Sequence, residues 1–162
     1  MRFPRTIRLD QTDLQVFDQA AQPGEWAVSG SFAFADAGPG DLVGKRRVAF
    51  RSAFLGTGSF GWSTFVSVAD ITPEEYDGVV QSLATHFVEH YGAPSVAAAL
   101  PVARDEAAYA ASLAEEHRVN MLLGVERDME ADGIHERFRV FEPPREEQHA
   151  RIWDIQPDDE NL

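Results

Sequence analysis

The sequence contains no cysteine. This absence excludes disulfide bonds, thiolate zinc sites, cysteine-bound iron–sulfur clusters and every mechanism with a cysteine nucleophile. Long apolar runs are also missing: no segment approaches the ~20 apolar residues that cross a membrane, and none follows the charged N-terminal residues as a signal sequence requires. We therefore expect a cytoplasmic protein with no membrane partner.

Basic residues are few, with 14 Lys and Arg against 27 Asp and Glu and a net charge of −13. The excess lies in residues 72–162, which hold twenty acidic and seven basic residues, whereas residues 1–71 hold seven of each. Nucleic acid binding depends on clustered cations that neutralise phosphates, so this distribution argues against a nucleic acid partner. An acidic half fits a basic protein partner better, or simply keeps the protein soluble.

Several segments alternate between apolar and polar residues, the pattern of half-buried strands. The clearest one runs from Glu25 to Asp36, with Trp26 and Phe34 on one face and small residues on the other. Asp132-Gly133 is a typical turn for a hairpin between two further strands. The predicted strands span residues 3–9, 14–17, 25–36, 62–71, 120–127 and 134–141.

Helix signals separate these strands. Thr72 and Glu75 have the spacing of a capping box, with proline at the first helical position between them. Asp41 can cap a second helix, which Gly56 would end. The predicted helices span residues 45–54, 72–91 and 104–117, the last beginning after Pro101 interrupts an alanine-rich segment.

Together the elements predict an α+β fold with an antiparallel or mixed sheet and helices packed on one face. Residues 1–142 form a single domain in this prediction, and residues 143–162 form a polar, acidic tail with a short apolar segment at 152–155. Exposed edge strands are compatible with a homodimer.

A glycine-rich run at Gly56, Gly58 and Gly61 has the spacing G-x-G-x-x-G. It resembles, locally, the nucleotide loop of protein kinases, but that fold needs a lysine on the following strand and no lysine follows Lys45. A dinucleotide fingerprint is also excluded, because this loop follows a predicted helix and leads into a predicted strand. No nucleotide-binding motif therefore remains.

Four cations lie within seven residues just before this loop. One interpretation is a solvated helix face that pairs with the acidic half of the chain. The other is an anion site in which the cations and the N–H groups of the glycine loop hold an acidic ligand. The candidate residues are Lys45, Arg46, Arg47 and Arg51 with Gly56, Gly58 and Gly61.

A second candidate site is His86-Phe-Val-Glu-His90, which fits the H-x-x-E-H pattern of inverted zinc peptidases. Histidines four residues apart lie one above the other on a helix and can share a divalent metal, while Glu89 could activate a water molecule. The pattern has only three fixed positions, and those peptidases are larger and use a further glutamate. The alternative is that His86 and His90 pack beside the buried stripe of the helix.

The tail contains an apolar island at Ile152, Trp153 and Ile155. Burying such side chains is favourable by about 1.5–3 kcal/mol each, so the island either docks on its own domain or binds a partner protein. Partner binding would combine this island with the acidic half of the chain.

Four segments, residues 2–9, 24–30, 50–61 and 86–94, resemble a family of small, uncharacterised bacterial proteins of about this length. The resemblance implies that the chain is a whole unit of that family, and it implies no activity. Two function classes remain open. The first is a non-enzymatic accessory or protein-interaction domain, and the second is a metal- or anion-binding domain that could be a hydrolase.

Overall fold

The main sheet of the protein has four strands in the order β1-β5-β6-β7, and every neighbouring pair is antiparallel. The structure is a computed structural model that describes residues 1–143. The last two strands form the predicted hairpin, which closes between Glu130 and Gly133. The strands are β1 (Arg2–Ile7), β5 (Phe65–Asp70), β6 (Leu122–Glu130) and β7 (Gly133–Phe141).

A smaller antiparallel sheet has the order β2-β3-β4, from β2 (Ala27–Val28), β3 (Phe54–Gly56) and β4 (Trp62–Ser63). An isolated β-bridge between Arg5 of β1 and Trp26 shows that this smaller sheet lies next to the main sheet. The glycine-rich run is therefore the hairpin loop between β3 and β4.

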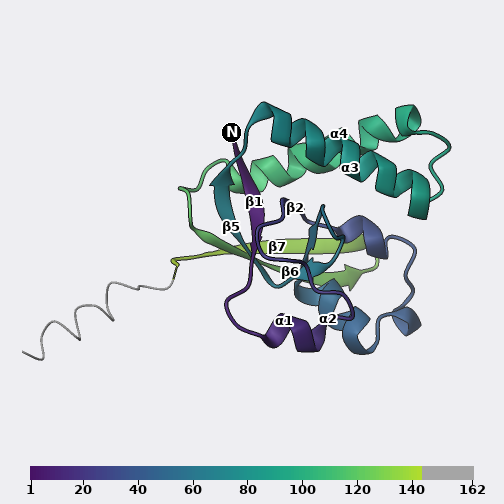
Figure 1. Cartoon of the computed structure of the whole chain (residues 1–162). Coiled ribbons are helices and arrows are strands. Elements are labelled where there is room, and N and C mark those ends of the chain that lie inside the picture. The colour runs from purple at the N-terminus through teal and green to yellow at the C-terminus, as the bar shows by residue number, and fades with distance from the viewer. Residues whose placement is uncertain (144–162) are drawn as a thin grey trace, which may run out of the picture.

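Four α-helices lie within residues 1–143: α1 (Thr12–Val16), α2 (Gly44–Ser52), α3 (Pro73–His90) and α4 (Val96–Ala114). Figure 1 shows α3 and α4 packed side by side as one layer, with α1 and α2 on the opposite side of the molecule. The prediction of a single-domain α+β fold is confirmed, and both sheets are antiparallel. No helix within residues 1–143 is both long enough and apolar enough to cross a membrane.

Two predicted strands are wrong. Residues 14–17 mostly belong to helix α1, and the strand predicted over 25–36 ends at Val28. Gly30 then adopts a φ of 84° and turns the chain into a 3-10 helix, Ser31–Phe34. A β-carbon at Gly30 would lie 2.6 Å from the Leu55 β-carbon, so the position requires glycine. The alternation in this segment reflects Phe32 and Phe34 packing from a helical turn.

Several other boundaries differ from the prediction. Helix α2 ends at Ser52, and Phe54, the last residue of the predicted helix, instead begins strand β3, which the sequence did not predict. The strand predicted over 62–71 is interrupted at Thr64, whose hydroxyl donates to the carboxylate of Asp13 at 2.6 Å. Helix α4 continues through Pro101, because its buried alanine face packs along its whole length. These alanines are Ala99, Ala103, Ala107, Ala110, Ala111 and Ala114.

Helix α3 begins as predicted. The Thr72 hydroxyl accepts a hydrogen bond from the backbone N–H of Glu75 at 3.1 Å, and the Glu75 carboxylate accepts one from the Thr72 N–H at 2.9 Å. Its apolar stripe, which includes Leu83 and Phe87, is buried in the core. Polar residues on another side of α3 line a cleft together with residues of α2.

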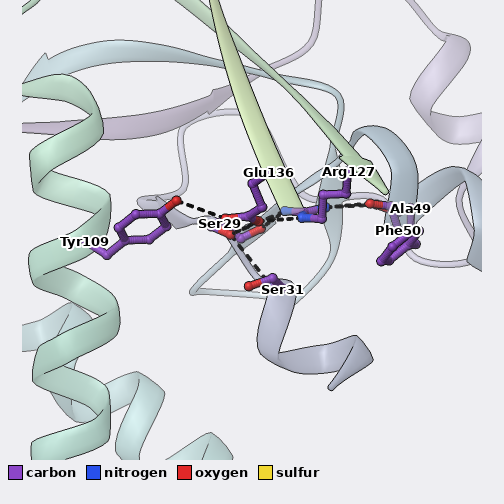
Figure 2. Close-up of polar contacts among 7 residues, drawn as sticks. All are labelled: Ser29, Ser31, Ala49, Phe50, Tyr109, Arg127 and Glu136. Atoms are coloured by element: carbon purple, nitrogen blue, oxygen red, sulfur yellow. Dashed lines mark hydrogen bonds and ion pairs between the residues drawn. The ribbon is translucent and has the colours of Figure 1, made fainter. Parts of the chain in front are cut away.

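A buried arginine connects α2 to the hairpin (Figure 2). Arg127 is 1% exposed; its Nε donates to the Glu136 carboxylate at 2.6 Å and its Nη1 to the Phe50 carbonyl at 2.8 Å, while Nη2 donates to the Ser29 carbonyl. Glu136 also accepts from the Tyr109 hydroxyl at 3.0 Å. Burial, together with Glu136, raises the pKa of Tyr109 to about 12, so the phenol remains a donor at neutral pH. The network fixes the C-terminal end of α2 in place.

Candidate ligand-binding cleft

An open cleft of about 990 Å³ lies between α2 and α3. Its volume is that of a site for a small organic molecule. Two sets of residues singled out in the sequence, one from the cation cluster and one from the histidine motif, border this same cleft. They are Lys45 and Arg46 on one side, and His86, Glu89 and His90 on the other.

The α3 wall of the cleft is a polar stripe at helical spacing. It begins with Gln81 and Ser82 and ends with Glu89 and His90. The Ser82 hydroxyl donates to the Thr57 carbonyl at 2.6 Å, which connects this wall to the β3–β4 loop. Gln81, Thr85, Glu89 and His90 are exposed to solvent, and they line the cleft together with residues of α2.

The cations of α2 are divided between two sides of the helix. Lys45 and Arg46 line the cleft, whereas Arg47 and Arg51 line a second cavity of about 550 Å³ with Asp128 among its residues. The Arg51 guanidinium lies 4.0 Å from the Asp128 carboxylate. The predicted cluster is therefore two surfaces, and only one of them faces the histidine motif.

Arg46 has no ion pair within residues 1–143, and its guanidinium lies 5.8 Å from the centre of the Phe34 ring. Lys45 lies 3.9 Å from Asp18, but both side chains are exposed, so that pair is weak. The cleft thus contains one guanidinium with free hydrogen-bonding capacity beside an aromatic surface.

Aromatic rings form part of the cleft on the α2 side. Phe34 is buried and stacks on Trp62 with ring centres 5.2 Å apart and an interplanar angle of 30°. Phe17 lines the same region. Lys45 and Arg46 are exposed, so these rings form an apolar surface beside solvent-accessible cations.

The N–H groups of the glycine-rich loop are occupied within the chain. Gly58 and Ser59 donate their backbone N–H groups to the Glu25 carboxylate at 3.0 and 2.8 Å, and Gly56 donates to the Gly61 carbonyl at 2.9 Å. The Gly61 N–H donates to the Ser59 hydroxyl at 3.1 Å. The loop does hold a carboxylate, but it is that of Glu25, so the cations of α2 are the groups left for a bound anion.

Phe60, at the tip of this loop, has a φ of 57°, in the left-handed region that a bulky side chain rarely occupies. Its ring is parallel to that of His86, with centres 3.7 Å apart, and both residues line the cleft. Burial and the nearby His90 lower the pKa of His86, and Glu89 opposes that shift. Burial raises the pKa of Tyr91 at the end of α3, and Arg46 opposes it from across the cleft.

Sequence reasoning missed Glu25 and Phe60 as parts of this site. Glu25 precedes the loop by more than thirty residues and has no motif of its own. Phe60 occupies one of the variable positions of the glycine pattern. A bulky residue inside such a pattern is the one signal that could have identified it.

The histidine pair provides two metal-binding side chains. The ring centres of His86 and His90 are 4.8 Å apart. Within residues 1–143, no three or more His, Cys, Asp or Glu side chains gather in a group that could hold a metal ion. A catalytic zinc site uses three protein ligands, so this arrangement does not fit one, and binding of a divalent metal here stays a prediction.

The predicted partner-binding residues Ile152, Trp153 and Ile155 lie outside the described residues. Their proposed role therefore stays a prediction.

Comparison with known proteins places the chain in a family. Residues 1–155 match the model of a family of unknown function, DUF6505, and the chain belongs to that family. No curated protein and no solved structure matches it. The predicted membership of a family without an assigned activity is confirmed, and the function must be argued from the cleft itself.

Proposed function

We propose that the protein binds a small organic anion, a carboxylate or a phosphate, in the cleft between α2 and α3. The observation that carries this proposal is the position of Arg46, which has no ion pair within residues 1–143 and lies on the cleft opposite the polar face of α3. A guanidinium forms charge-assisted, often bidentate hydrogen bonds with carboxylate and phosphate groups.

The other residues of the cleft support such a ligand. Lys45 can leave its weak contact with Asp18 and add a second positive charge. Gln81 and Thr85 on α3 offer donors and acceptors that would orient the rest of the molecule. Apolar rings and polar side chains line the cleft together, and in small-molecule sites such polar groups fix the orientation of the ligand.

The proposal favours the binding-domain class of function over catalysis. Metal binding at His86 and His90 would use the same cleft, and the two activities can be tested separately. We further propose a bacterial origin and a cytoplasmic location, which the resemblance and the cysteine-free composition support.

The test compares two neighbouring arginines of α2. Thermal unfolding is followed at low salt with added inorganic phosphate, acetate or cyclohexanecarboxylate, for the wild type, Arg46→Gln and Arg47→Gln. Both variants lose one positive charge, but only Arg46 lines the cleft. We expect at least one anion to bind about tenfold more weakly to Arg46→Gln and equally well to Arg47→Gln. Equal losses in both variants, or no binding of any anion by the wild type, would overturn the proposal.

A further inference from the structure

We infer that the organic part of the ligand is a flat aromatic ring, recognised by the stacked pair of Phe60 and His86. This inference rests on the proposed anion site and specifies its ligand class: a planar aromatic carboxylate or an aryl phosphate.

Phe60 has an unusual backbone conformation. A non-glycine residue with a φ of 57° is strained, and such strain persists only where the surrounding structure holds it in place. Glycine or asparagine would adopt this conformation at lower cost. The presence of an aromatic side chain therefore points to a use for its ring at this position.

A set of close contacts holds the loop that carries Phe60. The Glu25 carboxylate accepts from the N–H groups of Gly58 and Ser59 and from the Ser59 hydroxyl, the last at 2.6 Å. Gly61 packs so closely that a β-carbon there would lie 2.6 Å from the Ala20 carbonyl carbon. These contacts fix both sides of Phe60, and Glu25 acts as a positioning residue for its ring.

Aromatic rings lie along the cleft. Phe60 and His86, both partly buried, form a parallel stack with centres 3.7 Å apart, and the partly buried Trp62 stacks on Phe34, which is itself buried. A flat ring gains stacking energy on such surfaces that a saturated ring of the same size does not.

Arg46 completes the match. Its guanidinium already lies over the Phe34 ring, so the anion-binding group and an aromatic surface are adjacent. A ligand that places its acidic group at Arg46 extends its remaining atoms between the walls that carry Phe34 and Phe60. An aromatic acid satisfies both requirements with one rigid molecule.

The experiment compares two acids of equal charge and similar size, 1-naphthoate and decahydro-1-naphthoate, by isothermal titration of the full chain. The saturated acid is the more hydrophobic, so simple burial would favour it. We expect the wild type to bind 1-naphthoate roughly three- to tenfold more tightly. Phe60→Leu should lose this preference while still binding the saturated acid, Phe60→Tyr should keep it, and Glu25→Gln should reduce it.

Phe60→Asn provides a second removal of the ring in a residue that tolerates a positive φ, so one ring-free variant folds even if leucine does not. Equal binding of the two acids by the wild type would overturn the inference, as would a preference that survives in either ring-free variant. Either of these results would overturn only the aromatic-ring inference and would leave the proposed anion site unaffected. Failure of the wild type to bind either acid, or any anion of the first panel, would instead overturn the proposed function.

Discussion

The carboxylate of Glu25 is bonded twice to Ser59, by the backbone N–H at 2.8 Å and by the hydroxyl at 2.6 Å. The same carboxylate accepts the N–H of Gly58 at 3.0 Å. A segment that precedes β2 thus holds the β3–β4 loop against one wall of the cleft. The loop that resembled a nucleotide-binding motif is used to bind an acidic group of the protein itself.

Removal of this carboxylate should therefore weaken the fold. We expect Glu25→Ala to lower the free energy of unfolding by about 1–3 kcal/mol, because several N–H and O–H donors lose a charged acceptor. The measurement is urea denaturation followed by circular dichroism. Glu116→Ala, which removes an exposed carboxylate after α4, should change the value by less than about 0.5 kcal/mol. Similar values for the two variants would show that the loop does not depend on Glu25.

The buried Arg127–Glu136 pair should behave as a unit. Arg127→Met leaves the mostly buried Glu136 carboxylate without its cation, and we expect a loss of about 3–5 kcal/mol. A second change, Glu136→Gln, removes the uncompensated charge. The double variant should then be clearly more stable than the sum of the two single losses predicts, as measured by a double-mutant cycle in urea. Additive losses would contradict a direct interaction.

Two glycine substitutions should have opposite effects. Gly30→Ala should destabilise by more than about 1 kcal/mol, because the backbone has a φ of 84° and the new methyl group meets Leu55. Gly78→Ala, in α3 with open space around it, should stabilise by about 0.5–1 kcal/mol, since alanine is the better helix former. Thermal and urea unfolding measure both stability changes. A neutral Gly30→Ala would mean that the 3-10 helix Ser31–Phe34 does not need the left-handed turn before it.

His86 should make the stability of the protein depend on pH. Its pKa in the folded state lies below the usual 6.5, so as the pH falls below 6.5 the unfolded chain takes up a proton that the folded chain resists. This contribution to stability is complete above pH 6.5 and is lost as the pH falls through the lowered pKa. We expect the free energy of unfolding to fall less steeply below pH 6.5 in His86→Gln than in the wild type.

The control for this prediction is Gln81→Ala, which changes a side chain that does not titrate on the same wall of the cleft. Its pH profile should follow that of the wild type. If His86→Gln has the wild-type slope, the ring of His86 is not in the environment described here.

Metal binding by His86 and His90 is tested by a separate measurement. A native mass spectrum of the untagged protein after zinc addition reports any bound ion. With two imidazoles gathered at the cleft, we expect zinc to be weakly held and removable by a chelator, and Ala variants of His86 and His90 to bind less. A tightly held stoichiometric zinc that survives chelator would show that further ligands join the pair.

Much of the fold was predictable from local signals. The capping box at Thr72, the Asp132-Gly133 turn and the spacing of apolar residues in α3 act over a few residues, so the sequence displays them directly. The strand predicted over residues 25–36 was wrong because only tertiary contacts, the approach of Leu55 and Trp62 to Gly30, reveal the turn. Helix α4 passes through Pro101 for the same kind of reason, since packing outweighs local propensity.

The candidate site was predictable in its parts but not in its assembly. The cations of α2 and the histidines of α3 are visible as clusters in the sequence, about forty residues apart. Their position on one cleft depends on how the helices pack, and the division of the cations between two cavities depends on the rotation of α2. That rotation is fixed by Arg127, which binds the carbonyl of Phe50 from a strand that comes much later in the chain.

The most direct test of an anion site between α2 and α3 is to map where an anion binds, by amide chemical-shift changes during a titration of the isotope-labelled protein with 1-naphthoate. The proposal predicts saturable shifts at Arg46, Phe60 and His86, with little change at Arg51 and Met129 in the second cavity. Shifts that concentrate around Arg51 and Met129, or the absence of saturable shifts at the cleft, would contradict it.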